Sequence, residues 1–256
     1  MKNSKSIFTI LFAVFVGCIL NLQAQKNRKS QRPLVVSMSK PNVVLIVSDD
    51  QGNADAGYQR SPSTVSTPAI DKLAADGVIF TNGYASGYVC APTRAGLLTG
   101  RYQQRFGFYR APDSRIGLPV TEITLADVLK ENGYATGMFG KWHLGLTEKH
   151  NPINRGFDEF YGFLGHGGHD YFDLTIKENP NDKLQPMYRN LDKISDTGYL
   201  TDNLAREATS FIKAKANKEA PFFMYLPFNA VHTPMQAPEA DIKKYNTGNP
   251  KRAILL

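Results

Sequence analysis

The sequence has little cysteine: only Cys18 and Cys90 occur among its 256 residues. Cys18 lies in an N-terminal segment with the features of a cleavable signal. If that segment is removed, Cys90 is the only cysteine left, and an unpaired thiol is a liability in an oxidising compartment. Its neighbours are Gly, Pro, Thr and Arg rather than the apolar residues typical of a buried, inert cysteine. We therefore interpret Cys90 as a chemically functional residue.

The sequence also lacks an apolar run long enough to span a bilayer comfortably. The N-terminal run covers residues 7–20 and is preceded by Lys2 and Lys5. A small residue suited to signal cleavage stands at Ala24. These features predict a secretory signal peptide over residues 1–24.

A polar leader without periodicity is predicted over residues 25–40. Residues 15–18, Phe-Val-Gly-Cys, form an imperfect lipobox, so a lipid anchor on Cys18 is the alternative to simple secretion. The predicted location is secreted or periplasmic, with membrane attachment only if Cys18 is lipidated.

The folded part of the chain lacks an excess of charge of either sign. The formal net charge is +7, and six of the positive charges lie within residues 1–32: Lys2, Lys5, Lys26, Arg28, Lys29 and Arg32. Without them the charge is near +1, so the composition does not predict nucleic-acid binding. A local basic site for a sulfated polyanion remains compatible with this balance.

Strand and helix patterns alternate along the rest of the chain. The predicted strands are residues 42–48, 78–83, 134–139 and 221–226, and the predicted helices are residues 67–75, 93–98, 125–130 and 200–214. This alternation predicts an α/β fold with a mostly parallel central sheet flanked by helices. The run 42–48 is typical of a central strand buried on both faces. Residues 150–195 are expected to form an irregular, substrate-facing loop region.

Unusual polar residues stand at the ends of three predicted strands. Asp49 and Asp50 follow the first, Lys141 and His143 follow the third, and His232 follows the last. Ligands of α/β sheets bind beyond the carboxyl ends of the strands. We therefore expect these side chains to converge on one site.

Asp49 and Asp50 are adjacent carboxylates, which repel each other unless a cation neutralises them. Hard cations such as calcium take oxygen ligands, so the pair is a candidate metal site. The alternative is a helix N-cap or a turn pair.

Residues 90–94 read Cys-Ala-Pro-Thr-Arg at the expected start of a helix. A helix start offers free N–H groups and the positive end of the helix dipole, which suit an anion. Pro92 presets the first turn. Arg94 lies one turn after Cys90 on the same face and can hold an anion with two hydrogen bonds. A surface salt bridge is the alternative for an arginine alone, but the spacing from Cys90 favours the site.

The Cys-x-Pro-x-Arg sequence and the Leu-Leu-Thr-Gly sequence at 97–100 resemble the signature of the type I sulfatases, formylglycine-dependent enzymes of the alkaline phosphatase superfamily. Gly-Lys-Trp-His-Leu-Gly at 140–145 resembles their second signature. The resemblance runs from about Pro41 to His232 and implies an alkaline-phosphatase-like fold. It also implies that a maturation enzyme oxidises Cys90 to formylglycine. One hydroxyl of the hydrated aldehyde then attacks sulfur, and the other expels sulfate.

The resemblance implies roles for the remaining site residues. Arg94 holds the nucleophile and a sulfate oxygen, and Lys141 stabilises the transferring sulfonate. His143 is the base that releases sulfate, and His232 binds sulfate and protonates the leaving alcohol.

A calcium ion bound by Asp49, Asp50 and the modified Cys90 is also implied. The family pattern adds an Asp-Asn pair and a lysine after the last predicted strand, and these do not occur before the end of the sequence. We therefore expect residues 41–256 to form an incomplete sulfatase catalytic domain, its N-terminal part.

A glycine-rich segment around His169 and Asp170 is predicted to contact sugar hydroxyls. Loop packing is an equally open interpretation of both residues.

The leading hypothesis is a sulfuric ester hydrolase that removes sulfate from a sulfated carbohydrate or an aryl ester. One alternative is a phosphonate or phosphate ester hydrolase of the same superfamily. The other is an inactive, truncated fragment that binds sulfated glycans. Adjacent carboxylates together with Cys90 favour the first hypothesis.

Overall fold

The computed structural model describes residues 39–59, 66–165, 168–177 and 185–244. The chain divides into two compact units, Met1–Lys40 and Pro41–Leu256. The predicted signal peptide, the lipobox cysteine and nearly all of the leader lie outside the described residues. Within the described part, no helix combines the length and the apolar character needed to cross a membrane.

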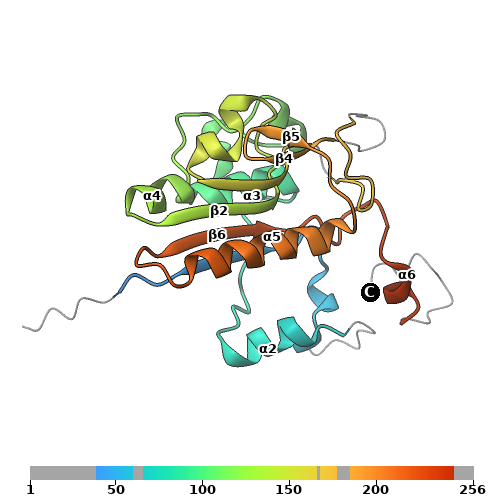
Figure 1. Cartoon of the computed structure of the whole chain (residues 1–256). Coiled ribbons are helices and arrows are strands. Elements are labelled where there is room, and N and C mark those ends of the chain that lie inside the picture. Colours follow the sequence, from blue (N-terminus) through green and yellow to red (C-terminus); the bar gives the residue numbers. More distant parts are fainter. Residues whose placement is uncertain (1–38, 60–65, 166–167, 178–184, 245–256) are drawn as a thin grey trace, which may run out of the picture. The chain divides into compact units, whose positions relative to one another are not determined.

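The second unit is built on a six-stranded sheet with the order β1-β6-β2-β3-β4-β5 (Figure 1). Its strands are β1 (Val43–Val47), β2 (Ala135–Lys141), β3 (Glu159–Phe163), β4 (Met187–Arg189), β5 (Asp192–Ile194) and β6 (Phe222–Pro227). The four strands β1, β6, β2 and β3 run parallel, whereas β4 and β5 add an antiparallel edge. The sheet is therefore mixed, with a parallel part that carries the predicted site.

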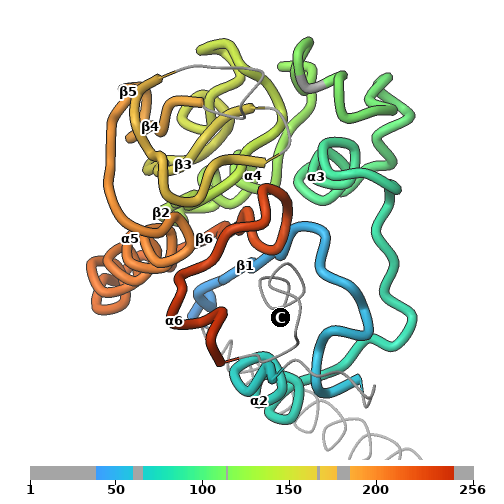
Figure 2. Tube along the Cα trace, turned by 90° about the vertical axis from the view of Figure 1, so that its right-hand side faces the viewer, coloured from blue at the N-terminus to red at the C-terminus, as the bar shows by residue number. Residues whose placement is uncertain are grey.

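Helices cover both faces of this sheet (Figures 1 and 2). Helices α3 (Cys90–Thr99) and α4 (Leu125–Glu131) cover one face and α5 (Leu200–Lys215) covers the other, whereas α2 (Pro68–Asp76) and α6 (Glu239–Ile242) contribute no residue to the core formed by the described residues. Short 3-10 helices occur at Asn53–Asp55, Gly57–Gln59, Gln103–Phe106, Ala111–Arg115, Glu148–His150 and Pro152–Arg155.

The alternation of side chains along β6 divides the core into two layers. Phe223 and Tyr225 pack with α3 and α4 on one face, whereas Phe222 and Met224 pack with α5 on the other. Successive strand residues point to opposite faces, so a strand that is apolar at every position serves both layers. The expected α/β sheet flanked by helices is confirmed.

Most predicted elements form close to their expected bounds. Helix α4 begins after Thr124, which accepts a hydrogen bond from Asp127 N at 3.1 Å while the Asp127 carboxylate accepts one from Thr124 N at 2.8 Å. This reciprocal capping box supplies partners for two N–H groups that the helix leaves free. Helices α2, α3 and α5 and strands β1, β2 and β6 also follow the sequence pattern.

Three expectations were wrong. In the described residues β1 pairs with β6 alone, and Val44 and Ile46 are exposed, so β1 is not buried on both faces. Residues 78–83 form no strand, because their apolar side chains pack against no partner and Phe80 is 83% exposed. Strand propensity depends on such a partner. Residues 150–195 are not an irregular loop, since they supply β3, β4 and β5.

A close backbone approach fixes the parallel centre of the sheet. Gly140 has φ 141°, and a Cβ there would overlap the carbonyl oxygen of Pro227. A Cβ at Gly162 on β3 would overlap the carbonyl oxygen of Gly140 in the same way. Only glycine allows β2, β3 and β6 this spacing just before the strand ends that carry the site.

We expect Gly140→Ala to lower the free energy of unfolding by about 3 kcal/mol or more, because the new methyl group meets backbone that cannot rotate away. Gly133→Ala is the matched control: Gly133 also has a positive φ of 84°, but nothing lies within 4 Å of the added Cβ. It should cost only about 1–2 kcal/mol of backbone strain. Urea unfolding of both variants measures the difference, and equal losses would contradict this interpretation.

Candidate active site

A buried carboxylate, Asp49, lies at the carboxyl end of β1 and contacts two cations. The Nζ atom of Lys141 donates a short hydrogen bond to Asp49 Oδ2, and Nη2 of Arg94 lies 3.6 Å from Oδ1. All three side chains are almost fully buried. Burial of charges is costly unless they are paired, so these three groups depend on one another.

The same cluster fastens α3 to the sheet. Lys141 is the last residue of β2, and its carbonyl accepts a hydrogen bond from Nη1 of Arg94 at 2.9 Å. Burial lowers the pKa of Lys141, as does the charge of Arg94, whereas Asp49 and the Cys90 side chain act in the opposite direction. Because Arg94 lies one helical turn after Cys90 in α3, this cluster stands next to the start of that helix.

Cys90 is the first residue of α3 and is a free, partly exposed thiol. The preceding segment is held in two places. Thr93 Oγ1 donates to the carbonyl of Gly87 at 2.9 Å, and Gln103 Nε2 donates to the carbonyl of Ser86 at 2.8 Å. A Cβ at Gly87 would lie 2.8 Å from Gln103 Nε2, so the turn fits closely against this side chain. Sequence analysis missed Gln103, which belongs to no motif.

Two of the predicted site residues have left-handed backbones. Asp50 has φ 59° and His143 has φ 60°, a conformation that is rare outside glycine and costs of order 1 kcal/mol or more. The N–H of His143 donates to the carbonyl of Leu164 at 3.0 Å, which fixes the strained turn to the neighbouring strand end. Such strain persists only where surrounding contacts impose it, and it is concentrated at functional sites.

Backbone hydrogen bonds bring the end of β1 to the loop after β6. Asp49 N donates to the carbonyl of Ala230 at 2.9 Å, and Val231 N donates to the carbonyl of Asp49 at 2.9 Å. As a result, His232 Nε2 lies 3.6 Å from Asp50 Oδ2. The structure thus brings together the polar residues at the ends of β1 and β6.

His169 and Asp170 bind the protein itself. His169 is fully buried, and its two ring nitrogens lie 2.6 Å from the carbonyl oxygen of Asp170 and 2.8 Å from that of Gln185. The Asp170 carboxylate accepts from Asp173 N at 2.7 Å and from Gln236 Nε2 at 2.7 Å. Burial opposes ionisation of Asp170, but these bonds outweigh it and lower its pKa. These contacts are those that the loop-packing interpretation predicts, and contact with sugar hydroxyls stays a prediction.

The residues present do not make a complete calcium site. Calcium takes six to eight oxygen ligands. Asp49 and Asp50 supply two carboxylates, and Asp49 is already neutralised by Lys141 and Arg94. Across the part of the chain that the structure describes, no group of three or more His, Cys, Asp or Glu side chains is arranged to hold a metal ion.

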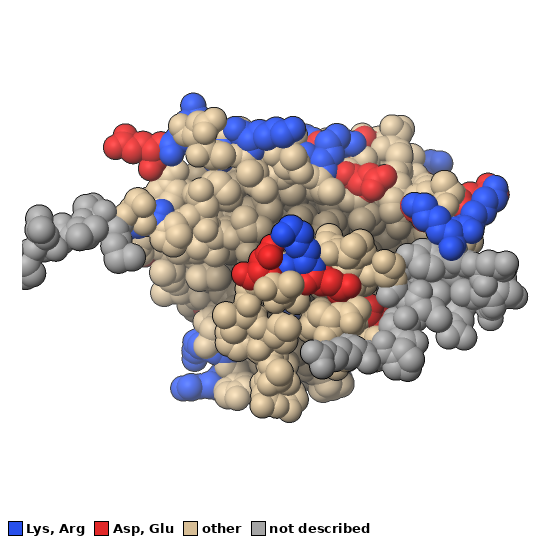
Figure 3. Space-filling view, turned by 90° about the horizontal axis from the view of Figure 1, so that it is seen from below, with Lys and Arg blue, Asp and Glu red and all other residues tan. Residues whose placement is uncertain are grey.

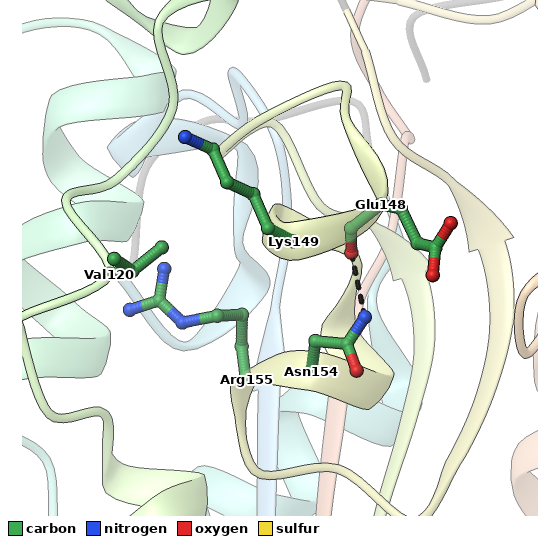
Figure 4. Close-up of a pocket in the computed structure, with 5 residues that line it drawn as sticks. All are labelled: Val120, Glu148, Lys149, Asn154 and Arg155. Carbon is green, nitrogen blue, oxygen red and sulfur yellow. Dashed lines mark hydrogen bonds between the residues drawn. The ribbon is translucent and has the colours of Figure 1, made fainter.

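A separate hollow of about 620 Å³ is lined by Val120, Glu148, Lys149, Asn154 and Arg155 (Figure 4). Asn154 Nδ2 donates to the carbonyl of Glu148 at 2.8 Å. The Arg155 guanidinium donates to the carbonyls of Leu118, at 3.0 Å, and Glu122, at 2.8 Å. This arginine therefore holds the 118–122 segment in place.

The charges on the face seen in Figure 3 do not form a basic patch. Lys and Arg side chains are spread over it and alternate with acidic ones. Lys141 and Arg94 are buried and therefore do not add to the charge of the surface.

We expect Lys141→Met to lower the free energy of unfolding by about 3 kcal/mol, because it leaves the Asp49 carboxylate buried without its closest cation. The double variant Asp49→Asn/Lys141→Met should lose less free energy of unfolding than the single variants Asp49→Asn and Lys141→Met lose together. Lys72→Met, which removes an ion pair to Asp76 with both side chains mostly exposed, should change stability little. Urea unfolding measures all four variants, and additive losses would show that Asp49 and Lys141 do not depend on each other.

The chain is similar to known proteins of one family. The profile of the Sulfatase family matches residues 41–254. An arylsulfatase of Hemicentrotus pulcherrimus is 38% identical over 235 residues, 84% of this chain and 40% of that protein. The N-acetylgalactosamine-6-sulfatase of Rattus norvegicus is 35% identical over 220 residues, 77% of this chain and 40% of that protein.

The chain is also similar to solved structures. The crystal structure of Ps i-CgsB in complex with k-i-k-neocarrahexaose is 39% identical with a TM-score of 0.76, over 84% of this chain and 51% of that one. The phosphonate monoester hydrolase of Agrobacterium radiobacter has a TM-score of 0.54 at 23% identity, over 82% of this chain and 45% of that one, which shows a shared fold alone. The chain thus spans about two-fifths of the curated relatives it matches. On the family match and these identities together, it belongs to the sulfatase family.

Proposed function

We propose that this chain carries the core of a sulfuric ester hydrolase in which Cys90, oxidised to formylglycine, provides the nucleophile. The observation that carries the proposal is the buried cluster of Asp49, Lys141 and Arg94 beside Cys90. It joins β1, β2 and α3 at the carboxyl edge of the parallel strands, where α/β proteins bind ligands.

The residues around Cys90 suit a sulfate group. The first turn of α3 presents N–H groups and the positive end of the helix dipole next to the Cys90 side chain. Arg94 and Lys141 place two cationic groups close by, in surroundings where charge interactions are stronger than in water. Their positions are fixed before any substrate binds, because both contact Asp49.

When formed, hydrated formylglycine supplies one hydroxyl that attacks sulfur and a second whose deprotonation expels sulfate and restores the aldehyde. His143 is assigned as the base for the second step, since it follows β2 two residues after Lys141. His232 is assigned as the acid that protonates the leaving alcohol, since its Nε2 faces Asp50 at 3.6 Å. A maturation enzyme that recognises the Cys-x-Pro-x-Arg segment is the implied partner.

A sulfated carbohydrate is the substrate class that we favour. One relative is named for N-acetylgalactosamine-6-sulfate chemistry, and one structural neighbour binds k-i-k-neocarrahexaose. The predicted signal peptide and an exported location fit an extracellular glycan. The phosphonate hydrolase shares the fold alone, so phosphate and phosphonate esters are included below as comparison substrates.

Cys90 should be present as formylglycine in the mature protein. Peptide mapping by mass spectrometry of the protein from its own source should give the mass of an aldehyde, not a thiol, at residue 90. Cys90→Ala should abolish turnover of aryl sulfates while circular dichroism and the unfolding midpoint stay unchanged, because the side chain is partly exposed. Cys18→Ala is the matched control and should keep full activity. Turnover retained by Cys90→Ala, or faster turnover of phosphonate than of sulfate esters, would contradict the proposal.

A separate prediction concerns calcium, which the family resemblance implies. Because the described residues offer only two adjacent carboxylates, we expect calorimetric titration of the 256-residue chain to give a calcium dissociation constant no tighter than about 10⁻³ M. Asp50→Asn should weaken even this binding. Micromolar affinity that Asp50→Asn removes would show that Asp49 and Asp50 suffice as the core of a calcium site.

A further inference from the structure

We propose that Gly168, Tyr171 and Gln236 are positioning residues for His232. They fix the ring so that its Nδ1–H is held by the Thr233 carbonyl and its Nε2 points to the site. The catalytic consequence of this arrangement rests on the proposed function, whereas the arrangement itself does not.

The Tyr171 hydroxyl makes the first contact. It donates to the carbonyl of His232 at 2.8 Å, across 61 positions of the chain. Tyr171 is 2% exposed, and burial raises the pKa of its hydroxyl, so the group remains a donor. The ring stacks on Tyr199 with 5.6 Å between centroids, which fixes its direction.

Gly168 makes the second contact through its lack of a side chain. A Cβ at this position would overlap the carbonyl oxygen of Thr233 and lie 2.8 Å from His232 Nδ1. That carbonyl is the group 2.8 Å from His232 Nδ1. A larger residue at position 168 would therefore displace the acceptor that holds the histidine ring.

Gln236 makes the third contact with both ends of its amide. Its Oε1 accepts from Tyr171 N at 2.8 Å, and its Nε2 donates to Asp170 Oδ2 at 2.7 Å. At the other end of the same loop, Asn229 Nδ2 donates to the carbonyl of His169 at 3.1 Å. The loop that carries His232 is thus fastened to the 168–171 segment both before and after the histidine.

These contacts determine which ring nitrogen is free. A carbonyl oxygen is only an acceptor, so Nδ1 of His232 must carry the proton that it shares with Thr233. In the neutral ring Nε2 then has a lone pair, and in the protonated ring Nε2 carries the proton that the acid transfers; this atom faces Asp50 rather than the protein interior. Outer contacts of this kind commonly set the tautomer and orientation of a functional histidine.

The test is ¹⁵N NMR of the full chain labelled at histidine, at a single pH above the histidine range so that neutral rings are compared. We expect the His232 signals of the unaltered protein to show protonated Nδ1 and unprotonated Nε2. Tyr171→Phe keeps the ring and removes only the hydroxyl, and it should shift the tautomer toward protonated Nε2 or broaden both signals. Tyr199→Phe removes a hydroxyl from the stacked ring, leaves the Tyr171–His232 bond in place and should preserve the His232 signals.

Gln236→Leu is a second variant, at a partly exposed position, in case Tyr171→Phe fails to fold; it should change the His232 signals in the same direction. Protonated Nε2 in the unaltered protein would overturn the proposal. So would His232 signals that are the same in the unaltered protein, Tyr171→Phe and Gln236→Leu.

The kinetic arm uses protein matured at Cys90 and an aryl sulfate. Tyr171→Phe should lower kcat roughly tenfold or more with little change in KM, because a misplaced acid affects the chemical step more than binding. The NMR arm needs no turnover. If Tyr171→Phe alters the His232 signals but the matured protein has no sulfatase activity, the positioning is upheld and the proposed function is refuted. If Tyr171→Phe keeps full kcat and unchanged signals, the positioning alone is refuted.

Discussion

The buried charge of Asp49 is the constraint on which the rest of the site depends. A carboxylate cannot remain ionised in the interior without partners, and Asp49 finds them in Lys141 and Arg94. Each partner comes from a different element, so satisfying one charge requires β1, β2 and α3 to be in register. The position of Cys90 follows, because it begins the helix that carries Arg94.

The parallel arrangement of the strands explains why these residues converge. Their carboxyl ends meet at one edge of the sheet, so Asp49 and Lys141, 92 positions apart in the sequence, contact each other there. The glycines at 140 and 162 let β6, β2 and β3 approach closely just before that edge. The left-handed turns at Asp50 and His143 then redirect the chain, and their strain is balanced by the backbone bonds on either side.

The sequence predicted this edge well because its signals are local. Apolar runs ended by charged residues mark β1, β2 and β6, and the Cys-x-Pro-x-Arg spacing marks the start of α3. Elements that depend on distant partners were predicted poorly. The run at 78–83 has strand-like residues but nothing to pair with, whereas the short strands β3, β4 and β5 exist only because β2 offers an edge to β3. The composition of β1 does not predict its edge position either, since an apolar run has the same residues whether one or both faces of the strand are covered.

The same distinction separates the proposed catalytic residues from the proposed positioning residues. Cys90, Arg94, Lys141 and the histidines after the strands stand in motifs, because their chemistry restricts the residue type and the spacing. Gln103 and Gln236 stand in none, because many side chains can make the hydrogen bonds that they make, to the carbonyl of Ser86 and to the Asp170 carboxylate and Tyr171 N. Their roles appear only when the distant segment that they hold is placed beside them. For this reason the sequence left His169 and Asp170 open between sugar contact and loop packing, and only the structure supplies their partners, Gln185 and Gln236. The close fit of Gly168 against Thr233 is the contact by which we propose that this glycine-rich segment supports His232, and it leaves the predicted sugar contact of His169 and Asp170 as a prediction.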